Sequence, residues 1–186
     1  GGDGKHRDLH PHPPRLSTKL EALAGKRVVA VSAGEYHSLA LTADGAVWSW
    51  GHGFQGRLGH GDTQNQLLPK KVEALAGQRV VAVSAGAFHS LGLTADGALW
   101  SWGEAAEGRL GHGDHQRQLL PNKVEALAGR RVVAVSAGFA HNLALTADGG
   151  VWSWGWGFQG RLGHGDQQNQ LLPKEIEALA GQRVVV

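Results

Sequence analysis

The stretch that decides the fold is residues 28–79, VVAVSAGEYHSLALTADGAVWSWGHGFQGRLGHGDTQNQLLPKKVEALAGQR. The same pattern starts again at Val80 and at Val132, with a period of 52 residues and no insertion or deletion. Residues 28–79, 80–131 and 132–183 are therefore three full copies of one unit. Self-similarity at a fixed period of this order indicates a repeat architecture rather than one irregular globular core.

The two ends of the sequence carry less than a full unit. Residues 16–27, LSTKLEALAGKR, match the end of a unit, and residues 184–186 match the start of a further one. Residues 1–15 match nothing else in the chain. Their polar, proline-containing sequence predicts a disordered arm.

Within one unit the local signals are those of short β-strands. In the first copy they predict four strands, at residues 28–32, 38–42, 46–50 and 67–74. Asp44-Gly45 supplies the positive φ of a tight hairpin turn. A glycine-rich loop covers residues 51–61, and residues 74–77 suit a single helical turn. Four short strands in a repeated unit describe a propeller blade, so we expect an all-β propeller segment of about three four-stranded blades.

Three segments of the unit resemble the repeat of the regulator-of-chromosome-condensation (RCC) family. In the first copy they are Gly34 to Leu39, Val47 to Gly51 and Gly56 to Gly61, and each recurs in the other copies. WD-type blades of ~40–45 residues and kelch blades of ~50 are excluded, because the unit has no Trp-Asp pair and no recurring Gly-Gly doublet.

The resemblance implies a seven-bladed propeller of four-stranded blades, in which a blade takes strands from adjacent repeats. Three repeats are then an incomplete ring. We therefore expect the chain to be part of a larger protein. A homodimer in which two arcs complete one ring is the alternative.

Composition and charge exclude several classes. The chain has no Cys, so disulfides and thiolate chemistry are absent, and it has no apolar run long enough for a membrane helix. Its formal net charge of +2 argues against nucleic acid as a partner.

The recurring polar and aromatic residues favour structural roles. His37 and His60 recur in every unit, whereas metal ligands converge on one site, so we expect no metal and no cofactor. Each imidazole is expected to bond a backbone group and lock a turn inside its own blade. The pair Trp48 and Trp50 is expected to pack between blades. No base and acid recur beside serines such as Ser49 in the pattern of a catalytic triad, so the sequence predicts no enzyme.

The copies differ mainly where strands end and in loops. Loops held by a rigid scaffold are where binding residues concentrate, and exposed aromatic side chains are typical anchors of protein interfaces. Neutral drift in loops without a role is the alternative. The candidate partner-binding residues are Glu35, Tyr36, His52, Phe54, Gln55, Phe88, Glu104, Glu107, His115, Arg117, Phe139, Trp156, Phe158 and Gln159.

We interpret the chain as a non-enzymatic protein-interaction scaffold. The resemblance implies two alternatives: a guanine-nucleotide exchange factor or chromatin-binding regulator of a Ran-type GTPase, and a substrate-recruiting propeller module of a ubiquitin ligase. Exchange in that family uses a protruding β-wedge, and these repeats carry no insertion that could form one. The expected partner is a protein, with a small GTPase as one option. The expected compartment is intracellular, cytoplasm or nucleus.

Overall fold

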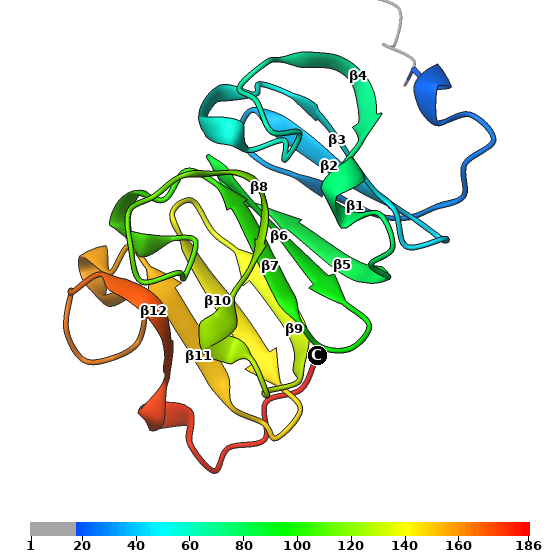
Figure 1. Cartoon of the computed structure of the whole chain (residues 1–186). Coiled ribbons are helices and arrows are strands. Elements are labelled where there is room, and N and C mark those ends of the chain that lie inside the picture. The colour runs from blue at the N-terminus through cyan, green and yellow to red at the C-terminus, as the bar shows by residue number, and fades with distance from the viewer. Residues whose placement is uncertain (1–17) are drawn as a thin grey trace, which may run out of the picture.

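The computed structural model describes residues 18–186, so the arm predicted at residues 1–15 lies outside the described part. Twelve strands form three four-stranded antiparallel sheets (Figure 1). The first contains β1 (Val28–Ala33), β2 (His37–Thr42), β3 (Val47–Gly51) and β4 (Gln66–Lys71). The second contains β5 (Val80–Ala85), β6 (His89–Thr94), β7 (Leu99–Gly103) and β8 (Gln118–Lys123). The third contains β9 (Val132–Ala137), β10 (His141–Thr146), β11 (Val151–Gly155) and β12 (Gln170–Glu175).

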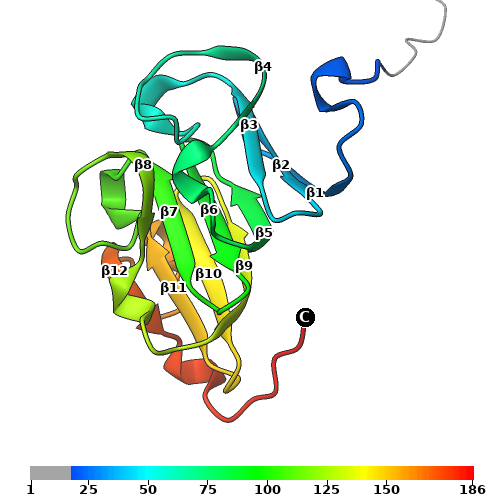
Figure 2. The same cartoon turned by 45° about the vertical axis from the view of Figure 1, so that its right-hand side comes forward.

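The three sheets follow one another as blades of an arc that does not close, which confirms the predicted all-β propeller segment. Strands are paired in sequence order within each sheet. The strands β1, β5 and β9 lie side by side along one edge of the arc, and β4, β8 and β12 form the opposite edge (Figures 1 and 2). Each sheet takes all four strands from one copy of the unit counted from Val28, whereas the resemblance implied blades shared between adjacent repeats.

Short 3-10 turns connect the strands, and residues 18–186 contain no α-helix. One set contains η1 (Glu21–Leu23), η3 (Glu73–Leu75) and η5 (Glu125–Leu127), which precede the inner strands β1, β5 and β9, and η7 (Glu177–Leu179), which follows β12. The other set lies between the third and fourth strands: η2 (Phe54–Gly56), η4 (Ala106–Gly108) and η6 (Phe158–Gly160). No helix in this part of the chain is long and apolar enough to cross a membrane.

The fourth strand is shorter than the sequence predicts. It ends at Lys71 rather than at Ala74, because the chain turns into η3 at Glu73, directly after the last backbone bond between the two strands, from the amide of Val72 to the carbonyl of Val47 at 2.8 Å. The third strand runs one residue further than expected, to Gly51. Residues 184–186 match the start of β1, β5 and β9 in sequence but form no strand in this structure.

The core lies between blades. One buried cluster joins Leu39 and Leu41 of the first blade to Trp102 of the second, and its equivalent joins Leu91 to Trp154 of the third. Both indoles have no exposed surface. The expected packing of tryptophan between adjacent sheets is thus confirmed for Trp102 and Trp154, because large rings bury much apolar surface there. Trp48 and Trp50 of the first blade are partly exposed.

Candidate functional site

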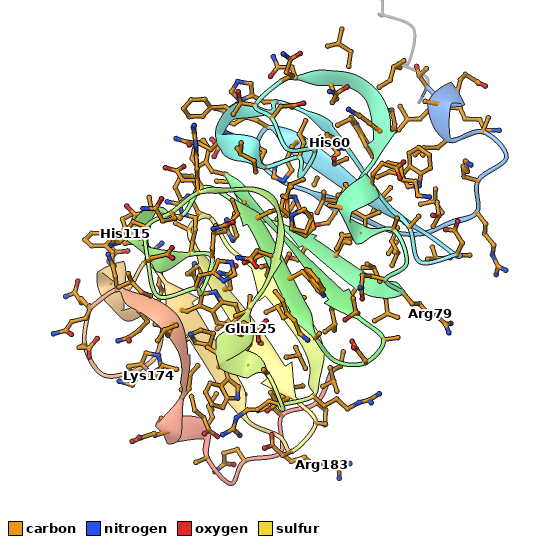
Figure 3. All side chains as sticks on the ribbon, in the orientation of Figure 1. His60, Arg79, His115, Glu125, Lys174 and Arg183 are labelled. Atoms are coloured by element: carbon orange, nitrogen blue, oxygen red, sulfur yellow. The ribbon has the colours of Figure 1, made fainter. Side chains whose placement is uncertain are left out.

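The candidate residues gather at one end of the blades. Because neighbouring strands run antiparallel, the β1–β2 turn and the β3–β4 loop lie at the same end of the sheet. We call this end the loop face. It comprises residues 34–36, 52–65, 86–88, 104–117, 138–140 and 156–169. Figure 3 shows His115 at this end and Arg79 at the opposite end of the blades.

The first blade presents a row of three rings on the loop face. Tyr36 meets His52 edge-on, with ring centroids 6.2 Å apart, and His52 stacks on Phe54 at 6.0 Å. Tyr36 is 56% exposed and Phe54 is 49% exposed. The row therefore offers aromatic surface to solvent from two separate loops of one blade.

A second row of rings crosses from the second blade to the third. Phe88 meets Phe139 edge-on at 5.9 Å, and Phe139 lies 6.4 Å from Trp156. Trp156 stacks on Phe158 at 5.3 Å with an interplanar angle of 13°. The guanidinium of Arg161 lies 4.2 Å from the centroid of the Trp156 ring, which adds a cation–π contact under the exposed rings.

The position of the aromatic residue in the β1–β2 turn shifts by one between copies. The second copy has Ala87-Phe88 and the third has Phe139-Ala140, and in both the alanine is buried. Phe139 is 51% exposed, whereas Phe88 lies partly buried between the blades. The position in the turn does not by itself decide the exposure, because Tyr36 occupies the position of Phe88 and is 56% exposed.

Two buried arginines support Phe88 from below. The guanidinium of Arg57 lies 4.6 Å from the Phe88 centroid, and that of Arg109 lies 5.9 Å away. Arg57 also donates from Nε to the carbonyl of Phe54 at 2.9 Å. Variation between copies could not single out these residues, because both belong to the repeated Gly-Arg-Leu-Gly-His-Gly segment. The repetition of this segment was the only sequence signal at these two positions, and it indicated a structural role rather than a binding role.

The two candidate acids of the middle blade are already paired. Glu104 lies 3.7 Å from Nη1 of Arg109, and Glu107 accepts a hydrogen bond from Nη2 of the same guanidinium. Arg109 is 4% exposed. The acids therefore neutralise a buried cation.

Side chains in the loops between the third and fourth strands form hydrogen bonds within the loop face. Asn65 and Asn169 accept from the amides of Gly53 and Gly157, each at 3.0 Å. At the equivalent position of the middle blade, Arg117 instead donates to Oε1 of Gln55 at 3.3 Å, across the blade boundary.

The three remaining candidates, Glu35, His115 and Gln159, also lie on the loop face. Glu35 and Phe139 line a shallow hollow at the inner edge, and His115 is exposed. Gln55, Glu107 and Gln159 share a left-handed backbone, with φ of 62°, 56° and 61°. The structure thus brings all fourteen candidates to one face, and seven of them form the two aromatic rows.

The first set of repeated histidines joins neighbouring blades. Nε2 of His37 lies 2.8 Å from Oγ of Ser90, and Nε2 of His89 lies 2.7 Å from Oδ1 of Asn142. The expectation that each imidazole bonds backbone within its own blade is wrong for these two, because the ring projects from the sheet face onto the following blade. Burial lowers the pKa of His37 to about 3 and that of His89 to about 4.

The second set of histidines pairs with serines, which sequence reasoning missed. Nε2 of His60 lies 2.9 Å from Oγ of Ser49, and the other two blades repeat the contact. Ser49 has no exposed surface and donates its hydroxyl to the carbonyl of Leu58 at 2.7 Å, so this oxygen is not placed to attack a substrate. Within residues 18–186 no group of histidine and acidic side chains is arranged to hold a metal ion.

The chain is similar to proteins that carry the same repeat. It is 38% identical to the ultraviolet-B receptor UVR8 of Arabidopsis thaliana over 96% of this chain and 40% of that protein. It is 41% identical to the human E3 ubiquitin-protein ligase HERC2 over 98% of this chain and 4% of that protein. The chain thus spans well under half the length of these relatives.

Solved structures show the same architecture. Prp20p of Saccharomyces cerevisiae, described with its binding to Gsp1p and histones, superposes with a TM-score of 0.75 and 28% identity over 84% of this chain and 40% of its own. Human WBSCR16 superposes with a TM-score of 0.74 and 30% identity over 81% of this chain and 38% of its own. The family model of the RCC1-like domain matches residues 1–186, and the chain therefore belongs to the RCC1-like domain family.

Proposed function

We propose that this chain is a non-enzymatic protein-interaction module that binds a protein partner through its loop face. The observation that carries the proposal is the pair of aromatic rows. The residues that form them differ between the copies, whereas the scaffold beneath them is repeated. Phe54, Phe139 and Phe158 are each about half exposed. Exposed aromatic groups held at fixed positions lose little conformational freedom on binding and are frequent anchors of interfaces.

The scaffold beneath the rings supports this role because it limits their movement. Ser90 donates to the carbonyl of Arg57 at 2.8 Å, and Asn142 donates to the carbonyl of Arg109 at 2.6 Å. The loops of the first and second blades are therefore each tied to the next blade by a buried hydrogen bond. A preorganised surface of this kind favours affinity over adaptability.

The partner can be identified by photo-crosslinking from the loop face. Phe158 is replaced by the photoreactive residue p-benzoylphenylalanine in the full chain, and the protein is irradiated in the cells that express it. The matched control carries the same residue at Ala126, which is exposed in η5 at the opposite end of the blades. We expect a discrete adduct from position 158 and none from position 126. Equal adducts from both positions, or none from position 158, would contradict the proposal.

A second candidate function is guanine-nucleotide exchange on a Ran-type GTPase. It is favoured by the likeness to Prp20p, which is described as binding Gsp1p. The test is the release of a fluorescent guanine nucleotide from a Ran-type GTPase in the presence of this chain. Accelerated release that is lost in the Phe139→Ala variant supports exchange through the loop face. An unchanged rate leaves the module without exchange activity.

Recruitment of substrates for a ubiquitin ligase is the third option. The likeness to HERC2 supports it, although this chain matches 4% of that protein. In this case the partner crosslinked from position 158 would itself be ubiquitinated in cells. Its ubiquitination would fall when Phe158 is replaced by Ala, and unchanged modification would exclude this role for the loop face.

A further inference from the structure

The middle blade holds a pocket of about 260 Å³ at the end opposite the loop face. The β6–β7 hairpin forms one wall of this pocket with Gly97 and Ala98, and the turn that follows η5 forms the other with Gly129. The middle blade has a neighbouring blade on each side, so the pocket lies inside the arc. Pockets that enclose drug-sized ligands measure ~300–1,000 Å³, so a smaller pocket indicates a small ligand.

Three cationic side chains line the pocket: Lys123, Arg130 and Arg131. Asp96 also belongs to the lining, and Oδ1 of that carboxylate accepts a hydrogen bond from the hydroxyl of Thr94. Positive charge therefore exceeds negative charge within the lining. An excess of this kind attracts an anion, and walls of low dielectric strengthen the attraction.

The charge of this pocket is specific to the middle copy. The equivalent pocket of the first blade measures about 100 Å³ and has Gln78 where the middle blade has Arg130. The third copy has Gln182 at this position, and it has Glu175 in place of Lys123. The backbone of the pocket is thus part of the repeated scaffold, whereas its three cations together occur in one copy, as expected of residues that serve a binding site.

The third blade fixes the orientation of Arg130. Its guanidinium lies 4.6 Å from the centroid of the Trp152 ring, and Nη1 lies 3.5 Å from Oδ2 of Asp148. Asp148 adds one carboxylate at the rim, so three cations face two acids in and around the pocket. The ion pair leaves most of the five N–H donors of the guanidinium available. A planar guanidinium held in one orientation suits the bidentate recognition of a phosphate group.

The other two cations are positioned by the sheet and its hairpin. A Cβ added at Gly97 would lie 2.8 Å from Cγ of Arg131, so glycine at this turn allows the stem of Arg131 to pack against the hairpin. Lys123 is the last residue of β8 and lies across from Trp100 of β7. The three side chains therefore reach one pocket from a strand, a turn and the residue before β9.

We propose that this pocket binds the phosphate group of a small phosphomonoester. Arg130 and Arg131 donate charge-assisted hydrogen bonds to the phosphate oxygens, and Lys123 supplies the third cation. Phosphate is favoured over a carboxylate because each of its three terminal oxygens can meet one of the three cationic side chains. The site lies at the opposite end of the blades from the loop face, so it stands apart from the proposed partner binding.

A nuclear magnetic resonance titration of the full chain tests the site, with glycerol 3-phosphate as the probe and glycerol as the uncharged control. The backbone amides of Gly97, Ala98 and Gly129 should shift in a saturable manner with the phosphate ester and should not shift with glycerol. Inorganic phosphate is the second probe. A weaker affinity for it would show that the rest of the ester contributes, and an equal affinity would identify the anion itself as the ligand, so both results support a phosphate site. Shifts that do not saturate with either probe at millimolar concentration would overturn the proposal.

Two variants separate a built site from a general effect of charge. Arg130→Gln gives the middle pocket the residue of the other two copies, so we expect the fold to be kept and the affinity for glycerol 3-phosphate to fall at least about tenfold. The matched control is Arg79→Gln, which removes the same charge at the same end of the blades but outside the pocket (Figure 3). Its affinity should equal that of the unmodified chain. Equal weakening in both variants, or no weakening in Arg130→Gln, would overturn the proposal.

Discussion

Nε2 of His89 lies 2.7 Å from Oδ1 of Asn142 in the next blade, and neither side chain has any exposed surface. The amide group of Asn142 also donates to the carbonyl of Arg109 at 2.6 Å. One buried amide side chain therefore connects the histidine of its neighbour to the loop beneath the aromatic rows. The contacts that hold the blades together are also those that fix the loop face.

The energetic coupling of this pair can be measured with a double-mutant cycle. His89→Ala and Asn142→Ala each leave a buried polar group without its partner, so each should lower the free energy of unfolding by about 2–3 kcal/mol. The loss in the free energy of unfolding of the double variant should be smaller than the sum of the two single losses by about 1 kcal/mol or more. The reason is that the second change removes the polar group that the first change left without a partner. Urea unfolding followed by tryptophan fluorescence gives the values. Additive effects would show that the two side chains do not interact.

Acid should weaken the fold before the carboxylates titrate. Burial lowers the pKa of His37 to about 3 and that of His89 to about 4, from an ordinary value of 6.5. At a pH between the lowered values and 6.5, the folded chain therefore binds fewer protons than the unfolded chain. The free energy of unfolding is therefore highest above pH 6.5 and should fall as the pH falls toward 4. Hydrogen bonds from threonines lower the pKa of Asp44 and Asp96 below 3.8, so their contribution is lost only at still lower pH.

The control for this pH dependence is His89→Gln, which keeps a hydrogen-bonding side chain that does not titrate. The slope of the free energy of unfolding against pH, measured by urea unfolding from pH 7 to pH 4.5, should be smaller in this variant. An identical slope would show that His89 is not one of the groups responsible.

Two glycines with the same backbone conformation should differ in tolerance. Gly59 and Gly77 both have positive φ, of 81° and 85°, so an alanine at either position costs about 1 kcal/mol from the backbone alone. A Cβ at Gly59 would also lie 2.9 Å from Nε1 of Trp102, whereas nothing lies within 4 Å of one at Gly77. Gly59→Ala should therefore lower the melting temperature clearly more than Gly77→Ala. Equal decreases would argue against a tight tryptophan contact.

The loop-face rings should divide into supporting and exposed groups. Phe158 is 46% exposed, so Phe158→Ala should change the free energy of unfolding by less than about 1 kcal/mol. Phe88 lies between two guanidiniums and Phe139, and Phe88→Ala should cost about 2–4 kcal/mol. Thermal unfolding of both variants tests the difference. A large loss in Phe158→Ala would mean that this ring supports the fold rather than a partner.

The fold could be predicted because every unit repeats the same local signals and forms a sheet from its own residues. Asp44-Gly45 marked the hairpin between β2 and β3. The expected packing of tryptophan between blades holds for Trp102 and Trp154, whereas Trp50 of β3 is partly exposed. The end of β4 could not be predicted from the sequence, because valine at position 72 is compatible with a strand as well as with a loop. The turn at η3, which begins at Glu73, decides where the strand ends.

The site could be predicted only where copies differ. Phe54 and Phe158 were found because their loops vary, while Arg57 and Arg109 were missed because they do not. The partner of His89 was also missed, since it lies 53 residues away on another blade and no local pattern links the two. The spacing between blades is a property of packed sheets, so contacts across it require the structure.

The most direct test of the loop-face account is the affinity of the crosslinked partner for single variants of the intact chain. Isothermal titration calorimetry would compare Phe158→Ala with Glu125→Ala, an exposed change in η5 at the opposite end of the blades. The account predicts that Phe158→Ala weakens binding at least about tenfold while Glu125→Ala binds like the unmodified chain. Equal affinities for both variants would contradict it.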